Sequence, residues 1–139
     1  MEDDPDWSAR VAAHRTRRPA SWTTLETRDL ATAIRDADVP VLIDCLGTWL
    51  TAVVDDAGAW DADNDVALGL VVARTDDVVK ALHACEQDVV LVTNEVGLGV
   101  VPEHRSGRLF RDLLGLVNQR VAAACDEVHL VVAGRVLRL

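Results

Sequence analysis

The sequence predicts an α/β domain with a mainly parallel sheet, because strand-like and helix-like segments alternate along it. Three short runs, at residues 39–43, 89–93 and 128–132, are apolar almost throughout. Continuous runs of this kind are typical of strands that helices cover on both faces, whereas half-exposed strands alternate apolar and polar residues. Helical periodicity follows the first run and separates the last two runs, which favours parallel pairing of the strands.

The clearest helical pattern occupies residues 107–125, between the second and third runs. Apolar side chains recur at helical spacing on one face of this segment, and polar side chains occupy the other. The apolar face consists of Phe110, Leu113, Leu114, Val117, Val121 and Ala124. The polar face carries Arg108, Arg111, Asp112, Gln119 and Arg120. We interpret Arg105, Arg108 and Arg111 as a solvated helix surface rather than a phosphate clamp.

Two further helices are expected, at about residues 46–54 and 65–85. Three residues suited to capping stand at the start of the second helix, and their charge interacts favourably with the helix dipole. They are Asp63, Asn64 and Asp65. Residues 55–62 are interpreted as a loop, and residues 135–139 as an added edge strand.

Composition and charge exclude several classes of protein. The 139 residues fit one domain, and the net charge of −9 opposes general nucleic-acid binding. No run of about 18 apolar residues occurs and the N-terminus has no apolar signal segment, so no membrane segment and a cytoplasmic location are expected. The three cysteines lack C-x-x-C spacing, which indicates reduced, buried thiols. Trp22 and Trp49 are interpreted as packing residues, and shielding a large ligand is the alternative role for either of them.

Polar side chains directly follow two of the predicted strands. Asp44 ends the first strand, and Asn94 and Glu95 end the second. Ligands of parallel sheets bind at the carboxyl ends of the strands, and an acid there suits a magnesium-nucleotide site. A strand-ending aspartate is also a common turn former or helix cap. Asn94 and Glu95 fit a role in bonding their own backbone equally well.

A phosphate-binding loop of the form G-x-x-x-x-G-K-[ST] does not occur in the sequence. The single lysine, Lys80, falls inside a predicted helix and has no such glycines near it. Gly97 and Gly99 cannot replace the loop, because no Lys-Ser/Thr pair follows them and Pro102 stands where a helix should begin. These glycines are interpreted as a tight turn.

The segment between Trp7 and Leu25 is positively charged in an otherwise acidic chain. It contains no carboxylate and includes Arg10, His14, Arg15, Arg17 and Arg18. A neutral imidazole is a good nucleophile near pH 7, and guanidinium groups neutralise the charge of a phosphate. These residues are therefore candidates for nucleotidyl transfer.

Several motifs resemble one family of bifunctional enzymes, the adenosylcobinamide kinases/adenosylcobinamide-phosphate guanylyltransferases. The run TNEVGLGVVPEHR at residues 93–105, followed by FRD, NQR and CDEV, is similar to the C-terminal half of that family. ARVAAHRTRRPASWTTLE at residues 9–26 and LIDCLGTWLT at residues 42–51 resemble two of its other motifs. The resemblance covers nearly the whole chain.

The resemblance implies a RecA-like P-loop NTPase fold and two reactions of cobalamin biosynthesis. One reaction phosphorylates adenosylcobinamide, and the other passes GMP from GTP through a histidine to adenosylcobinamide phosphate, giving adenosylcobinamide-GDP. GTP, ATP and Mg²⁺ are the implied cofactors, and a homo-oligomer is implied as well. Carried over motif by motif, the catalytic histidine is His14. The implied nucleotide-binding residues are Arg15, Thr16, Arg17, Arg18, Glu26 and Asp44, with Asp44 also binding Mg²⁺ and with Asn94 and Glu95 as a wall of the site.

Two departures from the family pattern change these expectations. Gly47 and Ala52 replace a hydroxyl residue and an amide residue, which alters the expected substrate contacts. The chain also begins beyond the family's first strand, P-loop and first helix. We therefore expect residues 1–139 to be a single incomplete domain, arising from a misplaced start or a natural loss. The alternative function is a binding or assembly subunit without catalytic activity.

Overall fold

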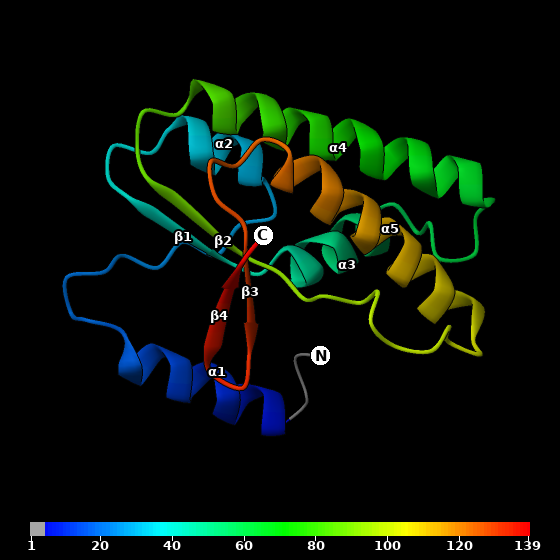
Figure 1. The fold of residues 1–139 in the computed structure, drawn as a ribbon, viewed down its shortest axis with the longest axis horizontal. Coiled ribbons are helices and arrows are strands. Elements are labelled where there is room, and N and C mark those ends of the chain that lie inside the picture. Colours follow the sequence, from blue (N-terminus) through cyan, green and yellow to red (C-terminus); the bar gives the residue numbers. More distant parts are fainter. Residues whose placement is uncertain (1–4) are drawn as a thin grey trace.

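The computed structural model describes residues 5–139. The first four residues, which contributed to the expectation of a cytoplasmic location, lie outside that range. Within it, helices and strands alternate along most of the chain (Figure 1). The helices are α1 (Pro5–Arg17), α2 (Leu30–Arg35), α3 (Leu46–Asp56), α4 (Asn64–Ala84) and α5 (Arg105–Ala122). The strands are β1 (Val41–Asp44), β2 (Val89–Val92), β3 (His129–Val132) and β4 (Arg135–Arg138). The predicted α/β class is confirmed.

β1 and β2 pair in parallel, as the intervening helices predict. The register joins Val41 to Val89 and Asp44 to Val92. β1 begins at Val41 rather than at residue 39, because Pro40 has no backbone N–H to donate to a neighbouring strand. A backbone hydrogen bond at the start of the two strands runs from the N–H of Val41 to the carbonyl of Asp88, at 2.9 Å. Both strands therefore end at the same edge of the sheet.

The predicted third strand does not join this sheet. β3 instead pairs antiparallel with β4, from His129 opposite Arg138 to Val132 opposite Arg135. Ala133 and Gly134 connect the two strands and have φ angles of 49° and 72°. A two-residue turn with positive φ at both positions matches the twist of antiparallel strands. The expectation of one mainly parallel sheet is corrected to two separate two-stranded sheets in the described residues.

The core lies where α4 packs against α2 and α5, and where α3 packs against α4 and α5. Completely buried side chains come from each of the three longer helices that face it: Leu50, Val54, Val71, Leu114 and Val117. Removing one such side chain from water contributes about 1.5–3 kcal/mol. Their regular spacing explains why the sequence predicts α3, α4 and α5 to within a few residues of their observed ends.

Helices cover one face of the β1–β2 sheet in the described part of the chain. Figure 1 shows α2 and α4 on the same side of the two strands. The side chains of Leu42, Val90 and Val92 remain 47%, 58% and 41% exposed. The prediction that both faces are covered is therefore wrong for this pair, because an apolar run does not reveal which of its faces finds a neighbour.

The sequence pattern predicts neither α1 nor α2. α2 has six residues and is too short to display helical periodicity. Its start is nonetheless well defined, because the Asp29 carboxylate accepts a hydrogen bond from the N–H of Thr32 at 3.1 Å. Leu30 and Ile34 are buried on the side that packs against α4. α1, which carries His14, extends over a segment where the motifs alone indicate no secondary structure.

Candidate functional site

The strand-ending acid lies where the sequence predicts it, at the carboxyl edge of β1–β2. Asp44 is opposite Val92, and Asn94 follows two residues later. The Asp44 and Asn94 side chains belong to exposed residues. Because α3 begins directly after β1, the backbone at this edge is held between a strand and a helix. The edge therefore presents oxygen atoms to solvent from a fixed position.

A small polar cluster joins the two strand ends. The Cys45 thiol donates to Oδ1 of Asn94 at 3.8 Å, and the Thr48 hydroxyl donates to the carbonyl of Cys45 at 2.9 Å. The N–H of Cys45 in turn donates to the Thr48 hydroxyl at 3.3 Å. A Cβ added to Gly47 would lie 2.9 Å from Oδ1 of Asn94. The residue at position 47 thus leaves room for Asn94.

Asn118 of α5 fixes the chain after β2. Its Nδ2 donates to the carbonyl of Asn94 at 3.0 Å, and the Thr93 hydroxyl donates to its Oδ1 at 2.6 Å. The motifs that contain Cys45 and Asn118 do not reveal these bonds, because the bonded residues of the β2 end lie far away in the chain. NQR is recognisable as a motif, but only the structure shows that its asparagine bonds to the strand end.

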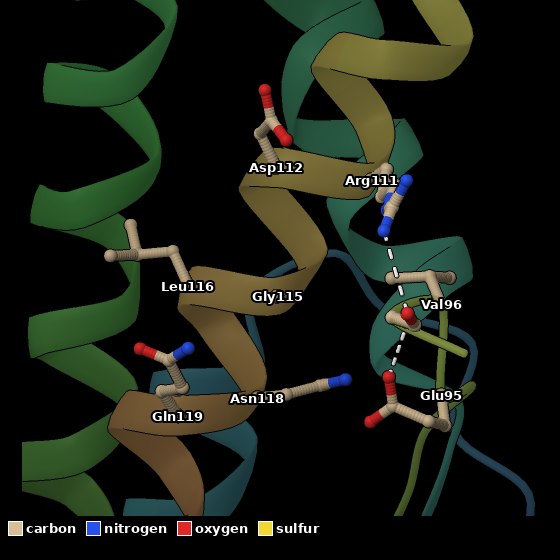
Figure 2. A pocket seen from close by; sticks show the side chains of 9 residues that line it. Glu95, Val96, Arg111, Asp112, Gly115, Leu116, Asn118 and Gln119 are labelled. Atoms are coloured by element: carbon tan, nitrogen blue, oxygen red, sulfur yellow. Dashed lines mark hydrogen bonds between the residues drawn. The ribbon is translucent and has the colours of Figure 1, made fainter. Parts of the chain in front are cut away.

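A pocket of about 420 Å³ lies between the chain after β2 and α5 (Figure 2). Glu95 bends back so that its carboxylate accepts a hydrogen bond from the N–H of Gly97. Arg111 of α5 points toward the same turn, and its Nη2 lies 3.4 Å from the carbonyl of Gly97. Gly115, Asp112 and Asn118 also line the pocket. The turn at residues 95–97 therefore forms one wall, and α5 forms the other.

The arginines of α5 lie at its surface, as the sequence predicts, and they also bond to neighbouring loops. Arg105 and Arg108 are exposed and Arg111 is partly buried. Arg105 donates to the carbonyls of Trp60 and Ala62, and Arg108 donates to the carbonyl of Pro102 at 3.2 Å. Arg111 contacts the carbonyl of Gly97. Each guanidinium thus bonds to the backbone of a loop. Their role in the structure is to hold loops against α5.

His14 lies in the last turn of α1, together with Arg15 and Arg17. Its side chain belongs to an exposed residue. Arg15 forms an ion pair with Glu26, and both side chains are more than half exposed, so solvent weakens that attraction. Arg18 donates to the Thr24 hydroxyl at 2.8 Å, and Thr16 donates to the carbonyl of Ala12 at 2.9 Å. The residues after α1 thus fold back toward its basic end.

The structure does not bring the two halves of the predicted site together. α1 is not among the elements that pack closely on one another, which are α2, α3, α4 and α5 and the paired strands. Figure 1 shows α1 on the opposite side of β1 and β2 from α2 and α4. His14 and Asp44 therefore belong to two separate groups in this structure. The basic group is carried by α1 and the acidic group by the β1–β2 edge.

The structure confirms some of the other sequence predictions and contradicts others. Trp49 is buried and its Nε1 donates to the carbonyl of Arg28 at 3.1 Å, which confirms a packing role. Trp22 is 52% exposed, so a packing role is wrong for it. The cysteines are free, as predicted, but only partly buried. Burial and the neighbouring Asp126 carboxylate raise the pKa of the Cys125 thiol.

Among the residues that the structure describes, no group of three or more histidine, cysteine or carboxylate side chains is arranged to hold a metal ion. Within the same residues, no helix is long and apolar enough to cross a membrane.

Comparison with known proteins identifies the family. A family model described as cobinamide kinase / cobinamide phosphate guanyltransferase matches residues 1–139. The chain belongs to this family. Among curated relatives, the bifunctional adenosylcobalamin biosynthesis protein CobU of Salmonella typhimurium is 41% identical over 139 residues, and that of Escherichia coli is 40% identical over 140 residues. The corresponding protein CobP of Pseudomonas aeruginosa is 36% identical over 137 residues.

Each of these three alignments covers 94% of this chain and between 73% and 77% of the relative. The resemblance found in the sequence motifs is therefore confirmed. As a member of the cobinamide kinase / cobinamide phosphate guanyltransferase family, the protein is an enzyme of cobalamin biosynthesis with kinase and guanylyltransferase roles. Both roles use a nucleoside triphosphate.

Proposed function

We propose that the protein phosphorylates adenosylcobinamide and then transfers GMP from GTP to the new phosphate through His14. The observation that carries this proposal is the position of His14 within the basic last turn of α1, in a chain whose residues 1–139 match the family model. An exposed imidazole followed closely in the sequence by Arg15, Arg17 and Arg18 suits attack on a polyphosphate. The histidine and the arginines come from one short segment.

The guanylyl transfer consists of two displacements at one phosphorus atom. An imidazole nitrogen of His14 attacks the α-phosphorus of GTP, a P–N bond forms, the bond to the bridging oxygen breaks, and pyrophosphate leaves. A phosphate oxygen of adenosylcobinamide phosphate then attacks the same phosphorus. The P–N bond breaks, its electron pair returns to the imidazole, and adenosylcobinamide-GDP is released.

The surroundings of His14 favour both displacements. Arg15, Arg17 and Arg18 place positive charge where the phosphate oxygens gain negative charge in the transition state. The carbonyl end of α1 stabilises a positive charge on the imidazole that carries the guanylyl group. Thr16 and Glu26 complete the proposed nucleotide contacts, and Glu26 orients Arg15 through their ion pair.

The β1–β2 edge supplies the acidic part of the proposed site. The Asp44 carboxylate would hold Mg²⁺, which would supply positive charge to neutralise the phosphates of the nucleotide. The fixed position of Asp44 between a strand and a helix suits this role. Asn94 and Glu95 would form the wall beside it. ATP or GTP would serve as the phosphoryl donor in the kinase step.

The parallel β1–β2 pair with an acid at its carboxyl end also supports a RecA-like relationship, which we propose for the fold. In this proposal, the arginines near His14 contribute to phosphate binding. We further propose a cytoplasmic homo-oligomer, in which α1 of one copy could approach the β1–β2 edge of another.

The test is covalent labelling of the purified protein with α-labelled GTP and magnesium. Acid-labile label should appear in the wild type and disappear in His14→Ala. His83→Ala is the matched control, because His83 is exposed on α4 and belongs to no proposed contact. Label in His14→Ala would overturn the role of His14. A wild type that binds GTP and cobinamide without acquiring label would instead support the alternative of a binding subunit.

A further inference from the structure

The pocket between the turn at residues 95–97 and α5 combines one cationic group with two anionic groups. Nη1 of Arg111 is buried and has no hydrogen-bond partner among the residues that the structure describes. Glu95 and Asp112 add carboxylates to the lining, and Asn118 and Gln119 add carboxamides. Figure 2 shows Arg111 extending from α5 toward the turn that carries Glu95 and Val96, while Asp112 points away from that turn. This mixture of charges and carboxamides limits which chemical groups of a ligand can bind in the pocket.

A phosphate group does not fit these charges well. Arg111 offers donors to it, but the carboxylates of Glu95 and Asp112 would repel it at short range. A primary carboxamide fits better, because it accepts hydrogen bonds through its oxygen and donates two through its nitrogen. Arg111 can donate to the oxygen, and Glu95 or Asp112 can accept from the nitrogen.

Apolar side chains continue the surface beyond the pocket. Leu98 and Val100 directly follow the turn and are 81% and 95% exposed, and Val101 is 61% exposed. Exposed apolar side chains gathered beside a pocket are typical of a ligand-binding surface. A ligand that suits both parts has amide arms at its edge and methyl groups on its faces.

We propose that this pocket receives carboxamide arms at the edge of the corrin ring of cobinamide, with Leu98 and Val100 against its methyl groups. The inference rests on the proposed function, which makes cobinamide the acceptor. Cobinamide has several primary amide arms, and a pocket of about 420 Å³ has room for an arm but not for the whole macrocycle. Arg111 and Glu95 would thus determine how the substrate is oriented.

Gly115 offers a direct way to fill the pocket without disturbing the fold. It lines the pocket from α5, and a Cβ at this position would meet no atom within 4 Å. Gly115→Leu should therefore fold normally and project its side chain into the space for the ligand. Gly69→Leu is the matched control, because Gly69 is also helical, also has nothing within 4 Å, and lies on α4 outside the pocket.

The test is equilibrium dialysis of the full chain against cobinamide, whose visible absorption gives the bound fraction. Gly115→Leu should weaken binding at least tenfold, and Gly69→Leu should leave it unchanged. Arg111→Met should weaken binding by roughly tenfold, the loss expected for a hydrogen bond to a charged donor. Thermal unfolding by circular dichroism identifies any variant that fails to fold. Unchanged affinity in folded Gly115→Leu, or no binding to the wild type, would overturn the inference.

A second arm tests the preference for amides. The corrinoid whose peripheral amides are hydrolysed to carboxylates should bind the wild type more weakly, and Asp112→Asn should recover part of that loss. Equal or tighter binding of the carboxylate form would make the pocket an anion site and overturn the proposal. The labelling of His14 by GTP is measured separately. Absence of label in the wild type therefore counts against the proposed function, and unchanged cobinamide binding by folded Gly115→Leu counts against this pocket.

Discussion

A Cβ added to Gly47 would lie 2.9 Å from Oδ1 of Asn94, closer than side-chain carbons ordinarily approach an oxygen. The two residues come from the first turn of α3 and the end of β2, so this approach joins the carboxyl ends of both parallel strands. The same Asn94 oxygen accepts the Cys45 thiol hydrogen bond at 3.8 Å. Position 47, where we expect this chain to depart from the family pattern, is thus a position at which a larger side chain would meet Asn94.

Replacing Gly47 by alanine should displace the Asn94 side chain. A glycine in an open helical position gains about 0.5–1 kcal/mol of stability when it becomes alanine. Gly69→Ala should show that gain, because its Cβ meets no atom within 4 Å. Gly47→Ala should gain less than Gly69→Ala, because the exposed Asn94 side chain must move and gives up its hydrogen bond from Cys45. Urea unfolding measures both variants, and an equal gain in both would contradict the close approach.

Asn118→Ala should loosen the chain after β2. The substitution removes the bond to the Asn94 carbonyl and leaves the Thr93 hydroxyl without its acceptor. We expect a loss of about 1–2 kcal/mol in the free energy of unfolding. Amide hydrogen exchange should also become faster between residues 93 and 97. Gln119→Ala, an exposed neighbour on the same helix, is the control, and equal effects in the two variants would refute the role of Asn118.

Asp29→Ala should lower stability in a way that depends on pH. The backbone hydrogen bond from Thr32, and then its side-chain hydroxyl, hold the pKa of Asp29 below its usual value. A carboxyl whose folded-state pKa is lowered stabilises the fold above its unfolded pKa of about 3.9, and this contribution is lost as pH falls through the folded-state pKa. The melting temperature of Asp29→Ala should therefore be lower than that of the wild type at neutral pH.

The difference in melting temperature between Asp29→Ala and the wild type should shrink as the solution is acidified below about pH 4. Asp36→Ala, at the other end of α2, provides a comparison in which the N-cap remains intact. A difference that stays constant down to the lowest pH at which the protein folds would mean that the carboxylate charge is not what stabilises the start of α2.

The β3–β4 turn should be stabilised by asparagine at position 133. Ala133 has a φ of 49°, a left-handed conformation that disfavours a Cβ and that asparagine tolerates better. We expect Ala133→Asn to raise the free energy of unfolding by about 0.5–1 kcal/mol. Gly134→Ala should lower it, because Gly134 has a φ of 72° and a Cβ there meets only backbone strain. Calorimetry of both variants measures these changes. A loss of stability in Ala133→Asn together with a gain in Gly134→Ala would contradict the prediction.

Periodicity in the sequence predicts the elements that have long buried faces. Rows such as Leu113, Leu114 and Val117 identify α5, and the runs that form β1 and β2 identify a parallel pair. The six-residue α2 escapes prediction because its stability comes from packing on α4 rather than from a visible repeat. The partner of β3 also escapes, since the turn that creates the hairpin contains Ala133, which is not a turn signal.

The sequence also predicts part of the candidate site, as it predicts part of the fold. Strand ends place Asp44 and Asn94 at one edge by simple topology, and the structure confirms that placement. Residues that act through distant partners were not predictable: Cys45 and Asn118 bond across the strand ends. Arg111 has the appearance of a solvated residue in a helical pattern, because exposure on a helix depends on loops whose paths the pattern does not describe.

The central claim is that His14 accepts the guanylyl group, and peptide mapping by mass spectrometry tests it most directly. The protein is incubated with GTP and magnesium, digested under alkaline conditions that preserve a P–N bond, and searched for a peptide heavier by one GMP. The account predicts this adduct on the peptide that contains His14, and its loss when cobinamide phosphate is added. An adduct on His83, His104 or His129, or a stable adduct that cobinamide phosphate does not discharge, would contradict it.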